Sequence, residues 1–304
     1  MSSFRQKHPI LLGLFILTGI FFLFLGGISL LISSLISQGS QTDIFSSKEG
    51  VGIVELKGLI ISPEKTLKHL TELRNSPNVK SIVLRIESPG GAVGASQEIY
   101  QEVKRTSATK PVIASMGSMG ASGGYYAALG ADTIIANPGT MTGSIGVIVK
   151  FPNLEGLYEK IGYKREVIKS GPLKDVGASN RPMSDKERKL IQDLIDNLYS
   201  QFVKDVAAAR SMPEETVKEL ADGRVYSGEQ ALELKLIDSL GNFTDAITMA
   251  AELGGLDIRD PRLIYPEGDR KFSLFNFLTN AEQSFVDNFV PLHPILSFEW
   301  TGMH

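Results

Sequence analysis

The chain has 304 residues, 42% of them hydrophobic, which is enough for one large domain or two modest ones with a sizeable core. Its formal net charge is −3, with 31 basic and 34 acidic residues mixed along the chain, so the sequence predicts no basic surface that would bind nucleic acid. It contains no cysteine, which excludes disulfides, thiol catalysis and cysteine-ligated metal sites.

The N-terminal segment predicts a membrane anchor. Arg5 and Lys7 precede an apolar run over residues 10–37, which is longer than the roughly 20 residues that cross a bilayer. Because no clear small-residue cleavage motif follows, we interpret the run as an uncleaved transmembrane helix rather than a cleaved signal peptide. The basic residues place 1–9 in the cytoplasm and the rest of the chain on the outer, periplasmic side of the inner (plasma) membrane. Residues 38–49 are polar and predict a linker.

Residues 50–257 predict an α/β domain. The stretches GVGIVELKGLI and SIVLRIE are typical of strands, and EKTLKHLTELRN between them has helical spacing. The turn SPGG then opens a second helix, PVIASM predicts another strand, and a glycine-rich turn opens a further helix before the strand TIIANP. Alternating strands and helices of this length imply crossover connections and a largely parallel sheet with helices around it.

The second half of the chain is predicted to be mainly helical. GSIGVIVK and KREVIK are further strand candidates, after which Ser184 and Glu187 form a capping box at the start of a long helix. Apolar residues from Leu190 to Val206 give that helix one face that packs on another element, and three shorter helices follow. The tail, residues 258–304, is rich in aromatics. We expect it to pack on its own domain or a neighbouring subunit, with contact to the membrane surface as the alternative.

A candidate nucleophile lies in the sequence GASGG. Ser122 stands between Gly120 and Gly124 in the G-x-S-x-G pattern, in which glycines let a sharp strand-to-helix turn expose a hydroxyl. Alone the pattern is weak, because small-residue turns between strands and helices are common. A histidine base is not favoured, since only His293 and His304 follow the serine and both lie in the aromatic tail.

A lysine amine can also activate serine, provided that the amine is neutral. From an ordinary lysine pKa near 10.4, this needs a depression of about three units, which burial among apolar groups can supply. Lys174 in SGPLKDVG is the best-placed candidate, because small and apolar residues flank it, whereas Lys186 and Lys189 stand on a charged helical face. The adjacent Asp175 would raise the pKa of Lys174 unless its carboxylate points away.

Catalysis also needs donors for the oxyanion, and backbone amides at turns and helix starts are well suited. The amide of Gly91 in SPGG and the amide of Gly123, directly after the serine, form the candidate pair. Each turn by itself is equally compatible with a purely structural role.

Five motifs follow one another along the chain: ESPGG, SMGSMGASGGYY, TGSIGV, SGPLKD and GRVYSGEQALELKLID. Taken together, they resemble the signal peptide peptidase A family of membrane-anchored serine proteases, in its short form with one catalytic domain. The resemblance implies a Clp protease/crotonase-like α/β fold of repeated β-β-α units, with Ser122 as nucleophile and Lys174 as general base. It further implies an oxyanion hole formed by Gly91 and Gly123, and Ser144 as the residue that orients the lysine ammonium.

The resemblance covers about residues 50–245 and also has implications for assembly and activity. It implies ring-like homo-oligomers, often octamers, in which the serine and lysine of one site come from neighbouring subunits, so that the interface buries Lys174. The implied activity is endoproteolysis of cleaved signal peptides and other unfolded membrane-associated peptides, without metal or organic cofactor. Such substrates predict pockets for small or medium apolar side chains.

Three alternatives stay open beside this prediction. The first is a related protease for envelope quality control, with other substrates. The second is a non-proteolytic membrane scaffold on the same fold, whose signature would be loss of Ser122 or Lys174; both residues are present. The third is a crotonase-like acyl-CoA enzyme, which would need neither a membrane anchor nor a paired serine and lysine.

Overall fold

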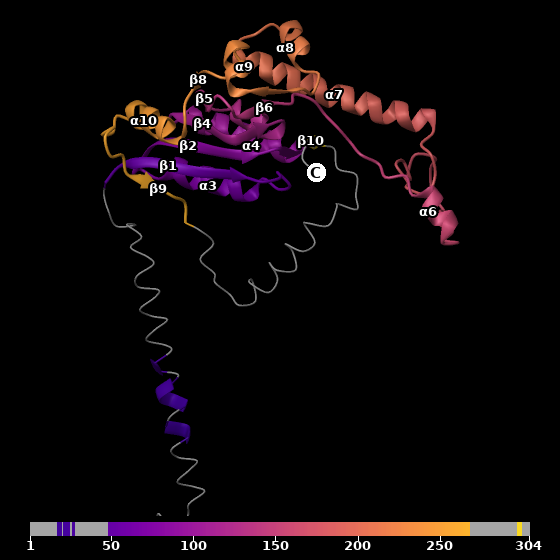
Figure 1. Ribbon diagram of the computed structural model, residues 1–304, viewed down its shortest axis with the longest axis horizontal. Helices are drawn as coiled ribbons and strands as arrows, with labels where there is room; N and C mark the ends of the chain where they lie inside the picture. Colours follow the sequence, from indigo (N-terminus) through magenta and orange to yellow (C-terminus); the bar gives the residue numbers. More distant parts are fainter. Residues whose placement is uncertain (1–16, 20, 25, 28–47, 268–296, 300–304) are drawn as a thin grey trace, which may run out of the picture. The chain divides into compact units, whose positions relative to one another are not determined.

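The computed structural model describes residues 17–19, 21–24, 26–27, 48–267 and 297–299 (Figure 1). The chain divides into two units, Met1–Ser47 and Lys48–His304. The described residues of the first unit are helical, and no helix among the described residues is both long and apolar enough to span a bilayer. Most of the predicted anchor, residues 10–37, lies outside the described residues, so the anchor stays a prediction.

The second unit is built on a mostly parallel β-sheet. Its described strands are β1 (Gly50–Lys57), β2 (Val79–Ser88), β4 (Val112–Ala121), β5 (Thr133–Ala136), β6 (Met141–Gly143), β7 (Val225–Ser227), β8 (Ser239–Leu240) and β9 (Leu263–Ile264). One path through the sheet runs β7-β6-β4-β2-β1-β9; off this path, β5 pairs with β4, and β8 pairs with β5. All these pairings are parallel except that of β6 with β7. The predicted α/β fold with a largely parallel sheet is confirmed.

Helices cover both faces of this sheet. The larger apolar cluster joins the sheet to α3 (Glu64–Asn75), α4 (Val93–Ser107) and α5 (Gly123–Ala128), and the smaller one joins it to α10 (Phe243–Leu253). Along β2, Ile82 and Leu84 belong to the first cluster and Val83 to the second. Because successive strand residues point to opposite faces, a strand buried on both sides needs an uninterrupted apolar run, which explains the sequence SIVL.

The long helix α7 (Asp185–Arg210) begins as predicted. The Ser184 side chain accepts a hydrogen bond from the Glu187 backbone N–H, and the Glu187 carboxylate accepts one from the Ser184 backbone N–H. The predicted apolar face, however, is buried only in the C-terminal half of the helix, where Phe202 and Val206 are fully covered. In the N-terminal half, Leu190 and Leu194 are 44% and 41% exposed. The first half of this face therefore has no covering element in the described chain.

Between the sheet and α7 lies an extended segment, residues 149–184, which we call the arm. It contains α6 (Glu155–Lys160) and, together with the first half of α7, it projects from the sheet (Figure 1). The two strands predicted from GSIGVIVK and KREVIK are wrong: β6 ends at Gly143, and residues 164–169 form no strand. Ile168 is 95% exposed, so the apolar residues that suggested strands find no sheet to join within the described residues.

Short elements complete the unit. Two further helices, α8 (Glu214–Leu220) and α9 (Gly228–Glu233), follow α7. Two segments of the tail pair with the domain: β9 lies beside β1, and β10 (Ser297–Glu299) lies antiparallel to β3 (Gly90–Ala92). The sequence did not predict either strand, because the tail lacks the alternation that marks longer ones.

Candidate active site

Ser122 lies at a sharp turn between β4 and α5. Its backbone has φ 53° and ψ −116°, a conformation that residues with a Cβ rarely adopt. The Ser122 N–H donates to the carbonyl of Gly143 at 2.8 Å, and the Ser122 carbonyl accepts from the N–H of Tyr126 at 2.8 Å. A Cβ at Gly124 would come within 2.9 Å of the Ser88 carbonyl oxygen, so only glycine allows α5 to start this close to β2. The turn is therefore a strained elbow held by its neighbours.

The elbow opens onto a cavity of about 560 Å³. Ser122, 1% exposed, and Ser144, 6% exposed, both line it. Ser144 also has a positive φ, 50°, and its N–H donates to the Arg224 carbonyl at 2.8 Å. The remaining lining residues are Gly146, Val147, Ile148, Ile195, Asp196, Tyr199, Ala221, Asp222 and Gly223. Since strained backbone tends to gather at functional sites, two strained serines on one cavity make it the candidate active site.

The structure places the amides of Gly91 and Gly123 beside each other. An ideal Cβ on Gly123 would lie 3.1 Å from the Gly91 nitrogen. On one edge of β3, the Ala92 N–H donates to the Ile60 carbonyl, and the Gly90 carbonyl accepts from the Ile60 N–H. Because N–H groups alternate along a strand, the Gly91 N–H points to the opposite edge. Two backbone donors next to the elbow are the arrangement that an oxyanion hole needs.

Lys174 is not part of this cavity. It lies exposed on the arm, and no lysine or arginine is among the cavity-lining residues of the described chain. The neighbouring Asp175 forms ion pairs with Lys169 and Arg181, which lower the pKa of its carboxyl. The carboxylate of Asp175 is thus engaged by two other cations. A single copy brings Ser122, Ser144, Gly91 and Gly123 together, but not Lys174.

The other serine and histidine candidates in the described chain do not line this cavity. Ser115 is buried in β4, where its Oγ accepts a hydrogen bond from Arg85 at 2.9 Å, and Ser118 is exposed on the same strand. His69 lies on α3 and does not line the cavity, while the remaining histidines fall outside the described residues. No cluster of potential metal ligands occurs in the part of the chain that the structure describes.

Sequence reasoning missed several residues around the elbow. Tyr126, one turn after Ser122 on α5, donates its hydroxyl to the Asp205 carboxylate; burial and this bond raise the pKa of Tyr126 well above its usual range. Asp222 lines the cavity and pairs with Arg224, which lowers the pKa of Asp222 to about 2. Only the residues YY directly after SGG could have drawn attention to Tyr126. Asp205 and Asp222 carry no local signal, because tertiary structure alone brings them here.

The family follows from a match to the model of peptidase family S49 over residues 104–257; the Clp protease model also matches, over residues 60–142. The chain belongs to peptidase family S49. It is 47% identical to "Putative protease slr0021" of Synechocystis sp., over 70% of this chain and 77% of that protein. It is 35% identical to "Putative signal peptide peptidase SppA" of Enterococcus faecium, over 72% of this chain and 61% of that one.

A solved structure supports the same fold for this S49 peptidase. A mutant of the 1510-N membrane-bound stomatin-specific protease superposes with a TM-score of 0.50 over 73% of this chain and all of that one, at 17% identity. The predicted family, the serine peptidase activity and the Clp protease-like fold are thereby confirmed. The S49 match covers the elbow, the arm and α7, while Gly91 lies outside it and within the Clp protease match.

Proposed function

We propose that this S49 peptidase cleaves peptides with Ser122 as nucleophile and Lys174, supplied by a second copy of the chain, as general base. The observation that carries the proposal is the strained elbow of Ser122 on a cavity, with the amides of Gly91 and Gly123 beside it. This geometry favours attack on a carbonyl carbon over a scaffold role, because strain at a serine has no evident structural benefit.

The reaction follows from the chemistry of these groups. The Lys174 amine takes the Ser122 proton as Oγ attacks the peptide carbonyl, and the N–H groups of Gly91 and Gly123 donate to the resulting oxyanion. The ammonium then protonates the leaving amine, and an acyl-enzyme remains on Ser122. Water next attacks the acyl carbon while the Lys174 amine accepts the water proton, and the ammonium returns a proton to Ser122 Oγ as it leaves. In this proposal the Ser144 hydroxyl accepts a hydrogen bond from the ammonium and so orients it; the position of Ser144 on the same cavity as Ser122 supports this role.

A second copy is proposed because the single copy leaves Lys174 in water. A lysine that acts as a general base must be neutral, and burial is what lowers a lysine pKa. The arm that carries Lys174 exposes several large apolar side chains, among them Ile161, Ile168 and Leu173. Burial of the arm against a neighbouring copy, within a ring-like homo-oligomer, would cover these side chains and desolvate Lys174.

The proposed setting is the membrane. We infer that residues 10–37 anchor the chain in the inner (plasma) membrane, with residues 1–9 in the cytoplasm and the peptidase domain on the periplasmic side. Signal peptides left in the membrane are the proposed substrates, in keeping with the name of the Enterococcus relative. A quality-control role on damaged membrane proteins is the competing proposal. Cleavage of a free signal peptide but not of an intact membrane protein would support the first.

Active-site labelling tests the dyad. The full-length protein in detergent is treated with a serine-reactive peptidyl phosphonate and analysed by intact mass and peptide mapping. We expect one adduct on Ser122 in the wild type and none in Lys174→Ala. The control is Lys186→Ala, which removes an exposed lysine on the charged face of α7 and should leave the Ser122 adduct unchanged. Labelling of another serine, or labelling that survives the loss of Lys174, would overturn the assignment.

A further inference from the structure

The strand that leads to Ser122 carries two more residues than the strand beside it. β4 pairs with β2 in one register as far as Ile86 opposite Met116, and in another register from Ser88 opposite Gly120. The single residue Glu87 on β2 therefore stands opposite three residues of β4, 117–119. Extra residues in one strand of a pair often redirect that strand next to a functional site.

The two extra residues determine where the elbow lies along the sheet. If the first register continued, Gly120 would be level with Gly90, two residues beyond its actual partner. At about 3.3 Å per residue, Ser122 would then lie roughly 7 Å further along the sheet. In the structure the elbow is level with the proposed oxyanion donors instead, since an ideal Cβ on Gly123 would lie 3.1 Å from the Gly91 nitrogen.

The carboxylate of Glu87 holds the extra residues on the β2 side. Its Oε2 accepts a hydrogen bond from the Ser118 N–H at 3.0 Å, and its Oε1 accepts one from the Met119 N–H at 3.1 Å. Each carboxylate oxygen thus binds one backbone amide. Since backbone N–H groups in a folded sheet need acceptors, the side chain supplies what the changed register does not.

Gly117 leaves room for this carboxylate. An ideal Cβ on Gly117 would overlap Glu87 Oε2 and would lie 2.9 Å from the carboxylate carbon. Gly117 does not have a positive φ, so space rather than backbone conformation requires glycine here. The buried hydroxyl of Thr140 donates to the Gly117 carbonyl at 2.6 Å. Side chains therefore hold both the N–H groups and a carbonyl of the three-residue segment.

We propose that Glu87 is a positioning residue for the peptidase reaction. By holding residues 117–119, its carboxylate sets the place of Ser122 relative to the two oxyanion donors. Glu87 does not line the cavity onto which the elbow opens, so it acts through β4 and not on the substrate. The inference rests on the proposed function, because it concerns how the nucleophile meets the oxyanion donors.

Glutamine at this position separates the two hydrogen bonds. It has nearly the size of glutamate, but it offers one acceptor oxygen, and its NH2 group would face a backbone N–H. Glu87→Gln should therefore release one of the two amides that the carboxylate binds. The strand end that carries Ser122 then loses its fixed position without loss of side-chain volume.

The rate of labelling of Ser122 tests this role. The full-length protein in detergent reacts with a peptidyl phosphonate at several concentrations, and intact mass gives the rate constant at saturation and the half-saturating concentration. We expect Glu87→Gln to lower the rate constant at least about tenfold, because misplacing a reacting group by about 1 Å can cost a hundredfold. The half-saturating concentration should change less than about twofold, since Glu87 does not contact the cavity.

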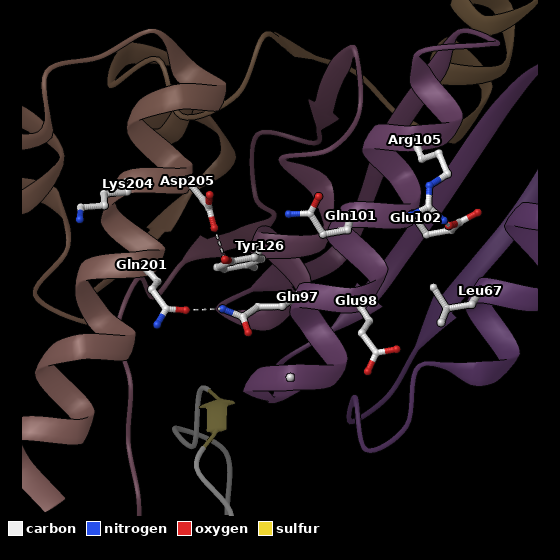
Figure 2. Close-up of a pocket in the computed structure, with 11 residues that line it drawn as sticks. Leu67, Gln97, Glu98, Gln101, Glu102, Arg105, Tyr126, Gln201, Lys204 and Asp205 are labelled. Atoms are coloured by element: carbon white, nitrogen blue, oxygen red, sulfur yellow. Dashed lines mark hydrogen bonds and ion pairs between the residues drawn. The ribbon is translucent and has the colours of Figure 1, made fainter.

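The control is Glu102→Gln, which removes another carboxylate held by hydrogen bonds. Glu102 is 5% exposed and accepts hydrogen bonds from Thr71 at 3.1 Å and from Arg105 at 2.7 Å. It lies on α4 beside a separate cavity of about 740 Å³ (Figure 2). Its replacement should lower stability and leave the rate constant within about twofold of wild type. Because a rate constant does not depend on the fraction of folded protein, the comparison separates positioning from stability.

A double-mutant cycle with Gly117 provides a second test. Gly117→Ala places a methyl group where the carboxylate lies, so it should slow labelling about as much as Glu87→Ala does. In the Glu87→Ala background that space is free, and Gly117→Ala should slow labelling by less than about twofold more. Gly139→Ala, where a Cβ would meet no atom within 4 Å, should label at the wild-type rate. If the Glu87 variants do not fold, Gly117→Ala against Gly139→Ala decides.

A wild-type rate constant in Glu87→Gln or in Gly117→Ala, or fully additive effects in the cycle, would overturn the proposal. Each of these results leaves the proposed function intact, because Ser122 is still labelled. Absence of an adduct on Ser122 in the wild type would instead refute the function itself, so the two failures are distinguishable.

Discussion

At the scale of single residues, the backbone conformation of Ser122 lowers the stability of the fold, and we attribute it to the proposed role of Ser122 as nucleophile. Its φ of 53° with ψ −116° costs on the order of 1–3 kcal/mol for a residue with a Cβ, and the surrounding fold must offset that cost. Glycine adopts positive φ without such a penalty. The strain is therefore a property of the backbone position and persists when only the hydroxyl is removed.

This predicts an unusual order of stabilities at one position. Ser122→Gly should be inactive yet more stable than Ser122→Ala by about 1 kcal/mol, which raises the thermal midpoint by roughly 2–4 °C for a domain of this size. At Ser118, in an ordinary strand conformation on β4, glycine should be the less stable replacement. Thermal unfolding of the four variants checks this. Equal midpoints for the two Ser122 variants would show that the elbow is not strained.

The sequence could single out the residues of the elbow, because their signals are local; their catalytic roles stay predictions. Glycines beside Ser122 and the turn SPGG mark sharp turns whatever the tertiary structure, and the structure brings Gly91, Gly123 and Ser144 around Ser122. The cluster of aromatic rings around Tyr126 could not be predicted in this way. Tyr126 and Phe202 are far apart in the sequence and look like ordinary core residues, and only folding brings their rings to 4.7 Å.

At the scale of elements, the sequence was reliable where burial within one copy decides the structure. β2, β4 and α4 formed as predicted because their apolar patterns match the sheet and its covering helices. The strand expected from KREVIK failed for the opposite reason, whereas GSIGVIVK contains the fully buried Ile145 and is covered within the copy without forming a strand. An apolar pattern predicts that a segment is buried, but it does not say which element buries it. The exposed apolar side chains of the arm indicate burial against another copy of the chain or another partner.

The start of α7, which follows the arm, depends on ionised Glu187. Its buried carboxylate accepts hydrogen bonds from Arg181 and from the N–H and hydroxyl of Ser184, and these hold the pKa of Glu187 far below its ordinary value of 4.5. Because the folded pKa is depressed, the stabilisation is complete above about pH 4.5. It is lost only as the pH falls from there through the folded pKa.

Hydrogen exchange of the first turn of α7 tests this dependence. Glu187→Gln should speed exchange of these amides strongly at pH 7, and the difference from wild type should shrink as the pH is lowered below 4.5. Glu215→Gln removes an exposed i,i+3 pair with Lys218 on α8 and should change little at either pH. A Glu187→Gln effect that stays constant down to strongly acidic pH would mean that the cap acts through shape rather than charge.

At the scale of the whole molecule, one copy does not bring the proposed base to the proposed nucleophile. Ser122 and the proposed oxyanion donors belong to the sheet and its helices, while Lys174 lies exposed on the arm. A serine without a general base beside it is a weak nucleophile, so a lone copy should be nearly inactive. Activity would then depend on assembly, which would confine cleavage to places where copies gather.

Mixing two inactive variants tests whether the site is shared. Ser122→Ala lacks the nucleophile and Lys174→Ala lacks the base, so each alone should be inactive. If the two residues of one site come from different copies, oligomers reassembled from an equal mixture regain roughly a quarter of the wild-type activity, because each interface draws its serine and its lysine independently. A mixture of Ser122→Ala with the double variant Ser122→Ala/Lys174→Ala should stay inactive, because no copy in it carries the serine.

The specific activity of the wild type should also fall on dilution, as the oligomers dissociate. If the mixture of the two single variants stays inactive although mass spectrometry shows mixed oligomers, the lysine acts within its own copy, and the arm must then close over the cavity instead.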